Sequence, residues 1–348
     1  MSLGPLMIDL EGTALSSQET ELLANPLVGG VILFSRNFES VDQLKDLVEA
    51  VHALRTPRLL IVVDHEGGRV QRFHREFTPI PPAAEIGKLF NTDRSAALKL
   101  AKQTGWLLAA ELRAVGVDMS FAPVVDIETG KSSVIGDRAW HRKPASVVEL
   151  TRSFIQGMKQ AGMAATIKHF PGHGSVSADS HHELPVDDRR FIDIQQRDML
   201  PFERLIQDGV PAVMTAHIRI PDVDDLPVSF SKRWIREELR HVLDFRGAVF
   251  SDDLCMEGAA SVGNFIERAK LALRAGCDML PVCNSRAAVV EILEGLQGYT
   301  DPAAQVRLVR LHGRDGVDWE TLRASDQWRE CRSAIQSMQG GTSLELDF

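Results

Sequence analysis

The sequence predicts an α/β protein, a single-domain (β/α)8 TIM barrel with extra C-terminal helices. Short apolar runs rich in β-branched residues recur eight times before about residue 300, and helix-like stretches separate most of them. The runs are continuously apolar rather than alternating, as expected of parallel strands buried on both faces. A doubly wound open sheet is the main alternative. It usually has fewer strands and a glycine fingerprint, and neither GxGxxG nor GxxxxGK[ST] occurs here.

The expected elements alternate along the chain. We place strands, by their apolar β-rich composition, at Leu6–Leu10, Gly30–Phe34, Leu59–Val63, Met119–Val125, Ala164–Lys168, Ala212–Thr215, Ala248–Phe250 and Met279–Val282. We place helices, by apolar residues at helical spacing, at Ser17–Leu23, Val41–Leu54, Ser95–Val115, Val147–Met158, Asp193–Ile206, Lys232–Leu243, Phe265–Ala275 and Arg286–Leu296. A longer insertion precedes the third helix, which Gly116 ends as a C-cap. Residues 1–300 should form the barrel, and residues 301–348 a helical extension packed on it.

Composition excludes several classes of function. The formal net charge is -9 and no basic stripe is present, which argues against nucleic acid as a partner. The four cysteines lack CxxC spacing and are expected to be buried thiols rather than a disulfide framework or zinc site. No apolar run approaches the roughly 20 residues that span a bilayer, and the N-terminus lacks the features of a signal peptide. We therefore expect a cytoplasmic protein without a membrane partner. The oligomeric state is not encoded in these features, and a monomer is the default assembly.

Polar residues follow the expected strands at the ends where barrel enzymes place their chemistry. Acids, bases and arginines occur at five of the eight strand ends, which solvation alone does not explain. The runs concerned are Asp64-His65-Glu66-Gly67-Gly68-Arg69, Lys168-His169-Phe170-Pro171-Gly172-His173-Gly174 with Asp179-Ser180-His181, Thr215-Ala216-His217, Ser251-Asp252-Asp253, and Gly136-Asp137-Arg138.

Two of these runs suit glycoside hydrolysis, in which one group attacks the anomeric carbon and another protonates the leaving oxygen. Asp252 directly follows a strand and so has the rigid position that a nucleophile needs. Capping of the next segment is the commoner role for such an aspartate. With Asp253 beside Asp252, one residue can fill each role. In an extended Asp179-Ser180-His181 segment the carboxylate and the imidazole share a side, so Asp179 could orient His181 as proton donor.

These motifs, with Phe250-Ser251-Asp252-Asp253-Leu254-Cys255-Met256-Glu257-Gly258, closely resemble glycoside hydrolase family 3 and, more narrowly, its bacterial single-domain β-N-acetylglucosaminidases of cell-wall recycling. The resemblance covers about Pro5 to Leu296. It implies a retaining double displacement in which Asp252 is the nucleophile and His181, oriented by Asp179, is the acid/base. It also implies that the N-acetylglucosamine ring is held by Asp64, Arg72, Arg138, Lys168 and His169. No cofactor is implied, and the partner is a small sugar substrate.

Two departures from the family pattern are small. His182 follows His181, and Cys255 stands where a small polar residue is expected. His173 is expected to brace its loop through backbone hydrogen bonds, whereas His217 fits a pocket wall and a buried polar contact equally. His65 and Glu66 are interpreted as structural neighbours of Asp64. Asp9 and Asp126 are unassigned, with capping or loop bracing as the default.

The rival hypothesis is a metal-dependent barrel hydrolase. In it, a cation would bind residues drawn from His169, His173, His181, His217 and Asp252. Lys168 and Arg138 would then place positive charge near that cation, and no His-x-His follows the first strand. A non-enzymatic sugar-binding barrel would not need an Asp–His pair beside a second carboxylate. The glycosidase is therefore the favoured hypothesis.

Overall fold

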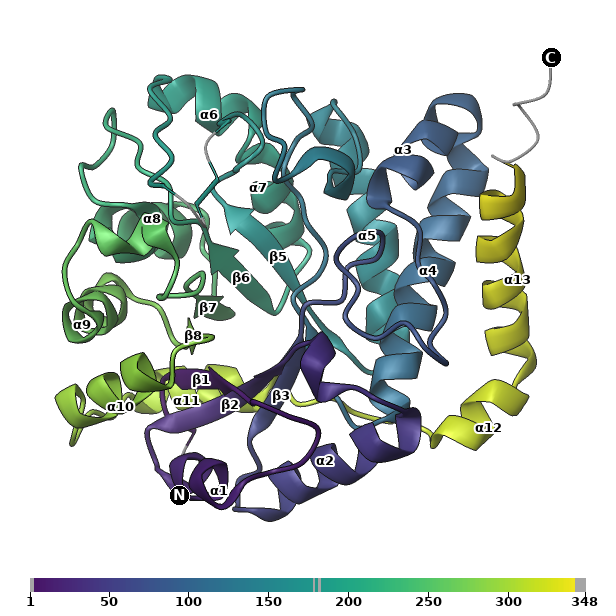
Figure 1. The fold of residues 1–348 in the computed structure, drawn as a ribbon. Coiled ribbons are helices and arrows are strands. Elements are labelled where there is room, and N and C mark those ends of the chain that lie inside the picture. Colours follow the sequence, from purple (N-terminus) through teal and green to yellow (C-terminus); the bar gives the residue numbers. More distant parts are fainter. Residues whose placement is uncertain (1–2, 178, 181–182, 342–348) are drawn as a thin grey trace.

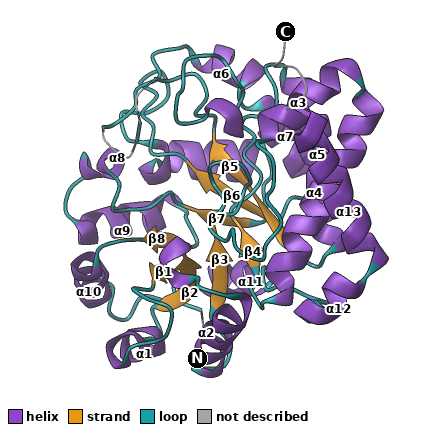
Figure 2. Ribbon diagram, turned by 45° about the vertical axis from the view of Figure 1, so that its right-hand side comes forward, coloured by secondary structure: helices purple, strands orange, loops and turns teal. Residues whose placement is uncertain are grey.

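A computed structural model shows eight parallel strands at the centre of the molecule with helices around them (Figures 1 and 2). It describes residues 3–341 except 178, 181 and 182. The strands are β1 (Leu6–Asp9), β2 (Val28–Leu33), β3 (Leu60–Val63), β4 (Met119–Ser120), β5 (Ala164–Phe170), β6 (Ala212–Thr215), β7 (Ala248–Phe250) and β8 (Leu280–Val282).

The strands close into a barrel. They pair in the order β7-β6-β5-β4-β3-β2-β1-β8. A parallel bridge from Phe250 to Met279, and a 3.1 Å bond from the Ser251 amide to the Met279 carbonyl oxygen, join β7 to the residue before β8. The predicted barrel is therefore confirmed.

The helices lie outside the barrel. They are α1 (Ser17–Ala24), α2 (Val41–Ala53), α3 (Ala83–Thr92), α4 (Arg94–Ala114), α5 (Pro144–Gln160), α6 (Phe191–Arg197), α7 (Leu200–Gln207), α8 (Glu257–Ala260), α9 (Phe265–Ala275), α10 (Arg286–Gly295), α11 (Pro302–Val309), α12 (Trp319–Ala324) and α13 (Asp326–Gly341). Short 3₁₀ turns occur at Ser35–Asn37, Gly136–Arg138 and Val228–Phe230, and Arg233–Val242 forms a π-helix.

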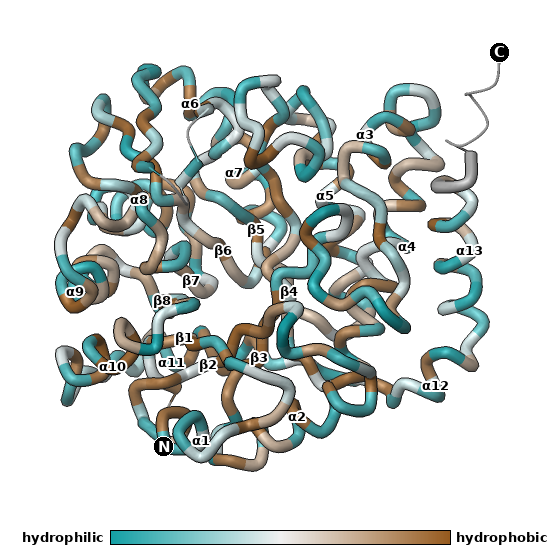
Figure 3. Tube along the Cα trace, viewed as in Figure 1, coloured by the Kyte–Doolittle hydropathy of each residue, from teal (hydrophilic) through white to brown (hydrophobic). Residues whose placement is uncertain are grey.

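Burial explains why the strand runs are so uniformly apolar. Every residue of β1, β2 and β3 is buried, because one face packs inside the barrel and the other against helices. Figure 3 shows the corresponding pattern, with hydrophobic segments on the strands and hydrophilic ones toward the outside. The apolar core thus fixes the positions of the strand ends.

Two expected elements are interrupted in the structure, and a proline lies at each interruption. The fourth strand, expected over Met119–Val125, is regular only at Met119–Ser120. Pairing resumes beyond Pro123, which has no amide hydrogen to donate, where Val124 forms a parallel bridge with Lys168. The expected helix Asp193–Ile206 is two helices, α6 and α7. Pro201 in the first turn of α7 could not continue α6, since it lacks the required donor.

The C-terminal helices pack against the outside of the barrel. In Figures 1 and 2, α13 runs beside α4, and α12 leads into it. In the described part of the chain, no helix combines the length and the apolar composition needed to cross a bilayer.

Candidate active site

A cavity of about 460 Å³ opens at the carboxyl ends of the strands. Seven of the eight residues expected to carry function line it: Asp64, Arg72, Arg138, Lys168, His169, Asp179 and Asp252. The eighth, His181, and its neighbour His182 lie outside the described residues. The barrel therefore brings together side chains that are up to 188 positions apart in the sequence, from Asp64 to Asp252.

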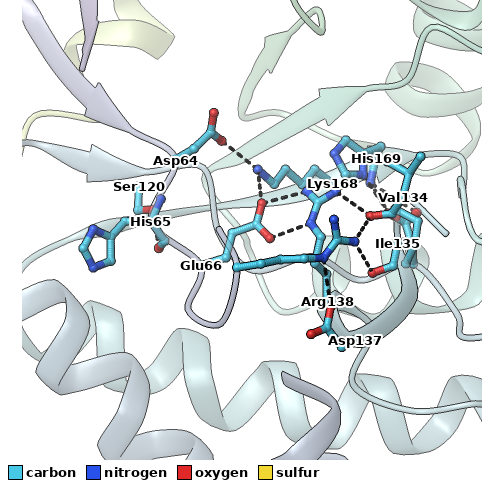
Figure 4. A network of polar contacts seen from close by, with 12 residues as sticks. Asp64, His65, Glu66, Ser120, Val134, Ile135, Asp137, Arg138, Lys168 and His169 are labelled. Carbon is cyan, nitrogen blue, oxygen red and sulfur yellow. Dashed lines mark hydrogen bonds and ion pairs between the residues drawn. The ribbon is translucent and has the colours of Figure 1, made fainter. Parts of the chain in front are cut away.

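A buried lysine is the centre of the cavity's ionic network (Figure 4). The Nζ atom of Lys168 lies 2.9 Å from Asp64 Oδ1 and 2.6 Å from Glu66 Oε1. Arg138 donates two bonds of 2.8 Å to the Glu66 carboxylate, from Nε and Nη2. The outer oxygen of Asp64 is 3.7 Å from the guanidinium of Arg72. Each polar group therefore has a fixed orientation before any ligand binds.

The charges of this network stabilise one another. Burial alone would raise the pKa of Glu66, but Arg138 and Lys168 outweigh it and hold that pKa well below its ordinary value. Burial would likewise lower the pKa of Lys168, and the carboxylates of Asp64 and Glu66 raise it instead. Glu66, Lys168 and Arg138 are thus charged at neutral pH. Charged side chains of this kind can form charge-assisted hydrogen bonds with sugar hydroxyls.

Glu66 lines the cavity and bonds to Lys168 and Arg138, whereas the sequence pattern indicates only a structural neighbour of Asp64. Alternation in an extended segment could have found it, because residues 64 and 66 then share one side. In Figure 4 both point toward Lys168, and His65 points away. The expectation for His65 holds: its ring packs 5.8 Å from that of Phe73, and burial lowers its pKa to about 3, so the ring is neutral.

Arg69 ties two loops of the cavity together. It extends from the segment after β3 to the loop after β4, where it bonds to the carbonyl oxygens of Ser133 (3.1 Å), Val134 and Ile135 (3.3 Å), and to Asp137 Oδ1 (3.0 Å). These bonds fix the turn that carries Arg138.

Asp126 is a second residue whose partners appear only in the structure. It is fully buried and accepts from the His173 amide at 2.7 Å and from Nδ1 of His169 at 2.7 Å. Burial would raise the pKa of Asp126, but the neighbouring His169 and His173 lower it. The carboxylate therefore holds the His169 proton on Nδ1 and leaves Nε2 as the other ring atom for ligand contact. Loop bracing, the default expectation for Asp126, is confirmed.

The two other histidines differ in their contacts. His173 braces its loop through its backbone, as expected, and its ring nitrogens have no hydrogen-bond partner among the described residues. His217 is wholly buried, stacks on Phe230 at 5.3 Å, and its Nε2 lies 3.0 Å from the Asp253 carbonyl oxygen. Of the two expectations for His217, the structure favours the buried polar contact.

The aspartate pair after β7 divides its contacts as the sequence suggested. Asp253 Oδ1 accepts 3.0 Å bonds from the amides of Cys255 and Cys283, so it caps its own turn and links β7 to β8. Asp252 lines the cavity, and its Oδ1 accepts a 2.9 Å bond from the Asp253 amide. Asp9 likewise braces the end of β8, through a 3.0 Å bond from the Asn284 amide.

All four cysteines are unbridged, as expected, and three of them are buried. Across residues 3–177, 179–180 and 183–341, no group of three or more His, Cys, Asp or Glu side chains is arranged to hold a metal ion.

Comparison with known proteins identifies the family. Residues 6–310 match the glycosyl hydrolase family 3 N-terminal domain. The chain belongs to glycosyl hydrolase family 3.

Individual relatives give the enzyme class. The chain is 52% identical to a beta-hexosaminidase of Thioalkalivibrio sulfidiphilus and 51% identical to one of Alkalilimnicola ehrlichii, each over 100% of both chains. The crystal structure of NagZ from Neisseria gonorrhoeae in complex with N-trifluoroacetyl-D-glucosamine matches with a TM-score of 0.93 at 39% identity, over 97% of this chain and 98% of that one. The predicted class of family 3 enzyme, a β-N-acetylhexosaminidase, is therefore confirmed.

Proposed function

We propose that this chain is a retaining exo-β-N-acetylglucosaminidase. It removes the non-reducing terminal GlcNAc from β-1,4-linked anhydro-muropeptides in peptidoglycan recycling, in the cytoplasm. The observation that carries the proposal is that Asp252 and Asp179 line the same cavity as the ionic network of Asp64, Lys168 and Arg138. The likeness to a NagZ that holds a glucosamine derivative supports the choice of sugar.

In the first step a carboxylate oxygen of Asp252 attacks the anomeric carbon and forms an ester bond to it. The bond from that carbon to the glycosidic oxygen breaks, and His181 donates its proton to the departing oxygen. Asp179 stabilises the imidazole in the required tautomer.

In the second step water attacks the anomeric carbon while His181 takes a proton from the water. The ester bond breaks and the Asp252 carboxylate is restored. The net reaction consumes one water and releases GlcNAc and the aglycone.

Sugar binding is assigned to charged and polar residues of the cavity. The hydroxyls of the ring form hydrogen bonds with Asp64, Arg72, Arg138, Lys168 and His169. Their existing contacts keep them in place, so little conformational entropy is lost on binding.

The nucleophile is tested with Asp252→Asn, which removes the attacking charge and should nearly abolish turnover while the protein stays folded by circular dichroism. A fluorinated sugar that traps the glycosyl-enzyme should label Asp252 in the wild type. A label on Asp253, or no adduct, would contradict the assignment.

The acid/base is tested with His181→Ala on two kinds of leaving group. General-acid help matters most for a strongly basic leaving oxygen and is worth about 10²–10⁴-fold. The loss should therefore be large for a disaccharide and small for an activated aryl glycoside, with Asp179→Asn showing the same pattern more mildly. Equal losses would leave His181 as a binding residue.

The aglycone is tested with purified GlcNAc–anhydromuramic acid disaccharide beside chitobiose and a β-glucoside, with phosphate added to detect phosphorolysis. We expect the first substrate to be turned over best.

Prolonged chelation should not change the rate, because a carboxylate and protons perform the chemistry. Loss of activity that zinc restores would support the metal-dependent alternative. Cell fractionation tests the location.

A further inference from the structure

The segment after β3, residues 64–82, has a face at the cavity and a buried turn behind it. We call it the β3–α3 loop. Asp64, Glu66 and Arg72 lie on the cavity side. The amide of Gln71 connects the two sides: its Nε2 donates to the Thr78 carbonyl oxygen at 3.1 Å, and its Oε1 accepts from the Ile80 amide at 2.9 Å. A shift of the turn at Thr78 is thus passed to Gln71 and its neighbour Arg72.

A buried carboxylate on α4 holds this turn. Glu111 is 1% exposed, and it accepts from the Thr78 amide at 2.9 Å and from the Thr78 hydroxyl at 2.6 Å. A third bond, of 2.8 Å, comes from Nε1 of Trp328. Burial raises the pKa of Glu111. Because a buried polar group is costly without partners, each of these donors matters to the position of the carboxylate.

The third donor comes from the C-terminal part of the chain, 217 positions away from Glu111. Trp328 lies in α13, which runs along α4 (Figure 1). The preceding helix, α12, adds a second contact to the same turn, where the ring of Trp319 lies 5.0 Å from that of Phe77. Both tryptophans are buried, so α12 and α13 cover the loop from the side opposite the cavity.

We propose that Trp328 is a positioning residue for sugar binding, which acts through Glu111 and Thr78 to fix the β3–α3 loop. The inference rests on the proposed function, because it takes Asp64 and Arg72 to be sugar-binding residues. Loss of the Trp328 donor frees Glu111 to move, and the turn at Thr78 moves with it. The nucleophile Asp252 follows β7, which neither Glu111 nor Trp328 contacts by a hydrogen bond in the described residues. Binding should therefore weaken more than the chemical step.

The test is the Trp328→Phe variant, which keeps an aromatic ring and removes the N–H. KM for an aryl β-N-acetylglucosaminide should rise by roughly 3- to 30-fold, the usual range of coupling through a packed network, while kcat changes by less than about twofold. Thr78→Val, which removes the hydroxyl donor, should act in the same way, and Thr78→Ser should restore the wild-type KM. The double variant should be less impaired than the product of the two single effects, because both act on one carboxylate.

Arg307→Gln is the matched control for general destabilisation. Arg307 lies in α11 and bonds to Asp278, so its loss weakens the C-terminal helices without touching the β3–α3 loop. It should lower the melting temperature and leave KM unchanged. The inference is overturned if Trp328→Phe and Thr78→Val leave KM at the wild-type value, or if Arg307→Gln raises it equally.

A further variant separates this inference from the proposed function. Asp64→Asn should raise KM strongly if the loop binds the sugar. If Asp64→Asn raises KM and Trp328→Phe does not, only the positioning role fails. If Asp64→Asn leaves KM unchanged, the proposed sugar-binding role fails, and the positioning role fails with it.

Discussion

At the scale of single residues, the site depends on buried charges that neutralise one another. Lys168 is 2% exposed, and its charge is tolerated only because Asp64 and Glu66 are within 2.9 Å of it. Taking two charges out of water costs several kcal/mol per ion, and such a pair is kept only with close geometry and further hydrogen bonds. Removal of one partner should therefore lower the free energy of unfolding far more than removal of an exposed ion pair does.

Glu66→Gln tests this expectation. It leaves Lys168 and Arg138 without their shared counter-charge, so the free energy of unfolding should fall by about 3–5 kcal/mol. Asp137→Asn is the matched control, because the Arg69–Asp137 pair is about half exposed and worth about 0–1 kcal/mol. Urea unfolding of both variants gives the comparison. Equal losses would show that the buried network carries no special share of the stability.

Asp253 should make stability depend on pH. Burial, with the charges of Asp252 and Asp9, raises its pKa from 3.8 to about 7. Between these values the folded protein keeps a proton that the unfolded chain releases, so stability is lost as pH rises from about 4 to 7, by at most about 1.4 kcal/mol per pH unit. Asp253→Asn should remove this loss. Urea unfolding across that pH range gives the free energy of unfolding of the wild type and of Asp253→Asn. The assignment is contradicted if both proteins show the same dependence on pH.

At the scale of elements, the neighbouring helices α4 and α5 pack through close backbone contacts. A Cβ atom on Gly105 of α4 would lie 2.1 Å from the Phe154 carbonyl oxygen of α5, and one on Gly157 of α5 would lie 2.0 Å from the Lys102 carbonyl oxygen of α4. The two glycines thus allow α4 and α5 to cross closely. The same helix, α4, carries Glu111.

Gly105→Ala should lower the free energy of unfolding by about 1–3 kcal/mol, since the added methyl group forces the helices apart. The better helix propensity of alanine, about 1 kcal/mol, offsets only part of the strain. Gly12→Ala is the control, because no atom lies within 4 Å of a Cβ placed there. Thermal or urea unfolding that ranked the two variants alike would refute the close-contact argument.

At the scale of the whole molecule, the two ends of the barrel have different tasks. The cavity lies at the carboxyl ends of the strands. At the opposite end Asp278, just before β8, accepts from Arg240 at 2.8 Å, from Arg307 at 2.6 Å and from the Val249 amide at 2.8 Å. This second network joins α11 to the barrel, and it matches the general division in which one end carries chemistry and the other stability.

Arg307→Gln should therefore destabilise the protein by about 1.5–3 kcal/mol, the range for a hydrogen bond to a charged group, and leave kcat/KM unchanged. Melting temperature and steady-state kinetics measure the two effects. A fall in kcat/KM for the folded variant would show that the two ends are coupled.

Much of the fold and of the site could be predicted from the sequence because both depend on local patterns. Burial on both faces makes a parallel strand continuously apolar, and the barrel places every strand's carboxyl end at one mouth. Asp64, Lys168 and Asp252 could be chosen as cavity residues for this reason alone. Proline limited the accuracy within elements, since Pro123 and Pro201 interrupt regular structure where the apolar pattern continues.

The sequence by itself determined the barrel, the family and most of the residues at the cavity mouth. The tertiary structure decided which of these residues pair and what holds them from behind. Glu66 with Arg138, Asp126 with His169, and Glu111 with Trp328 are 72, 43 and 217 positions apart. The physical reason is that the strength of an ionic or hydrogen-bonded contact depends on distance and burial, which the fold sets and which separation along the chain does not encode.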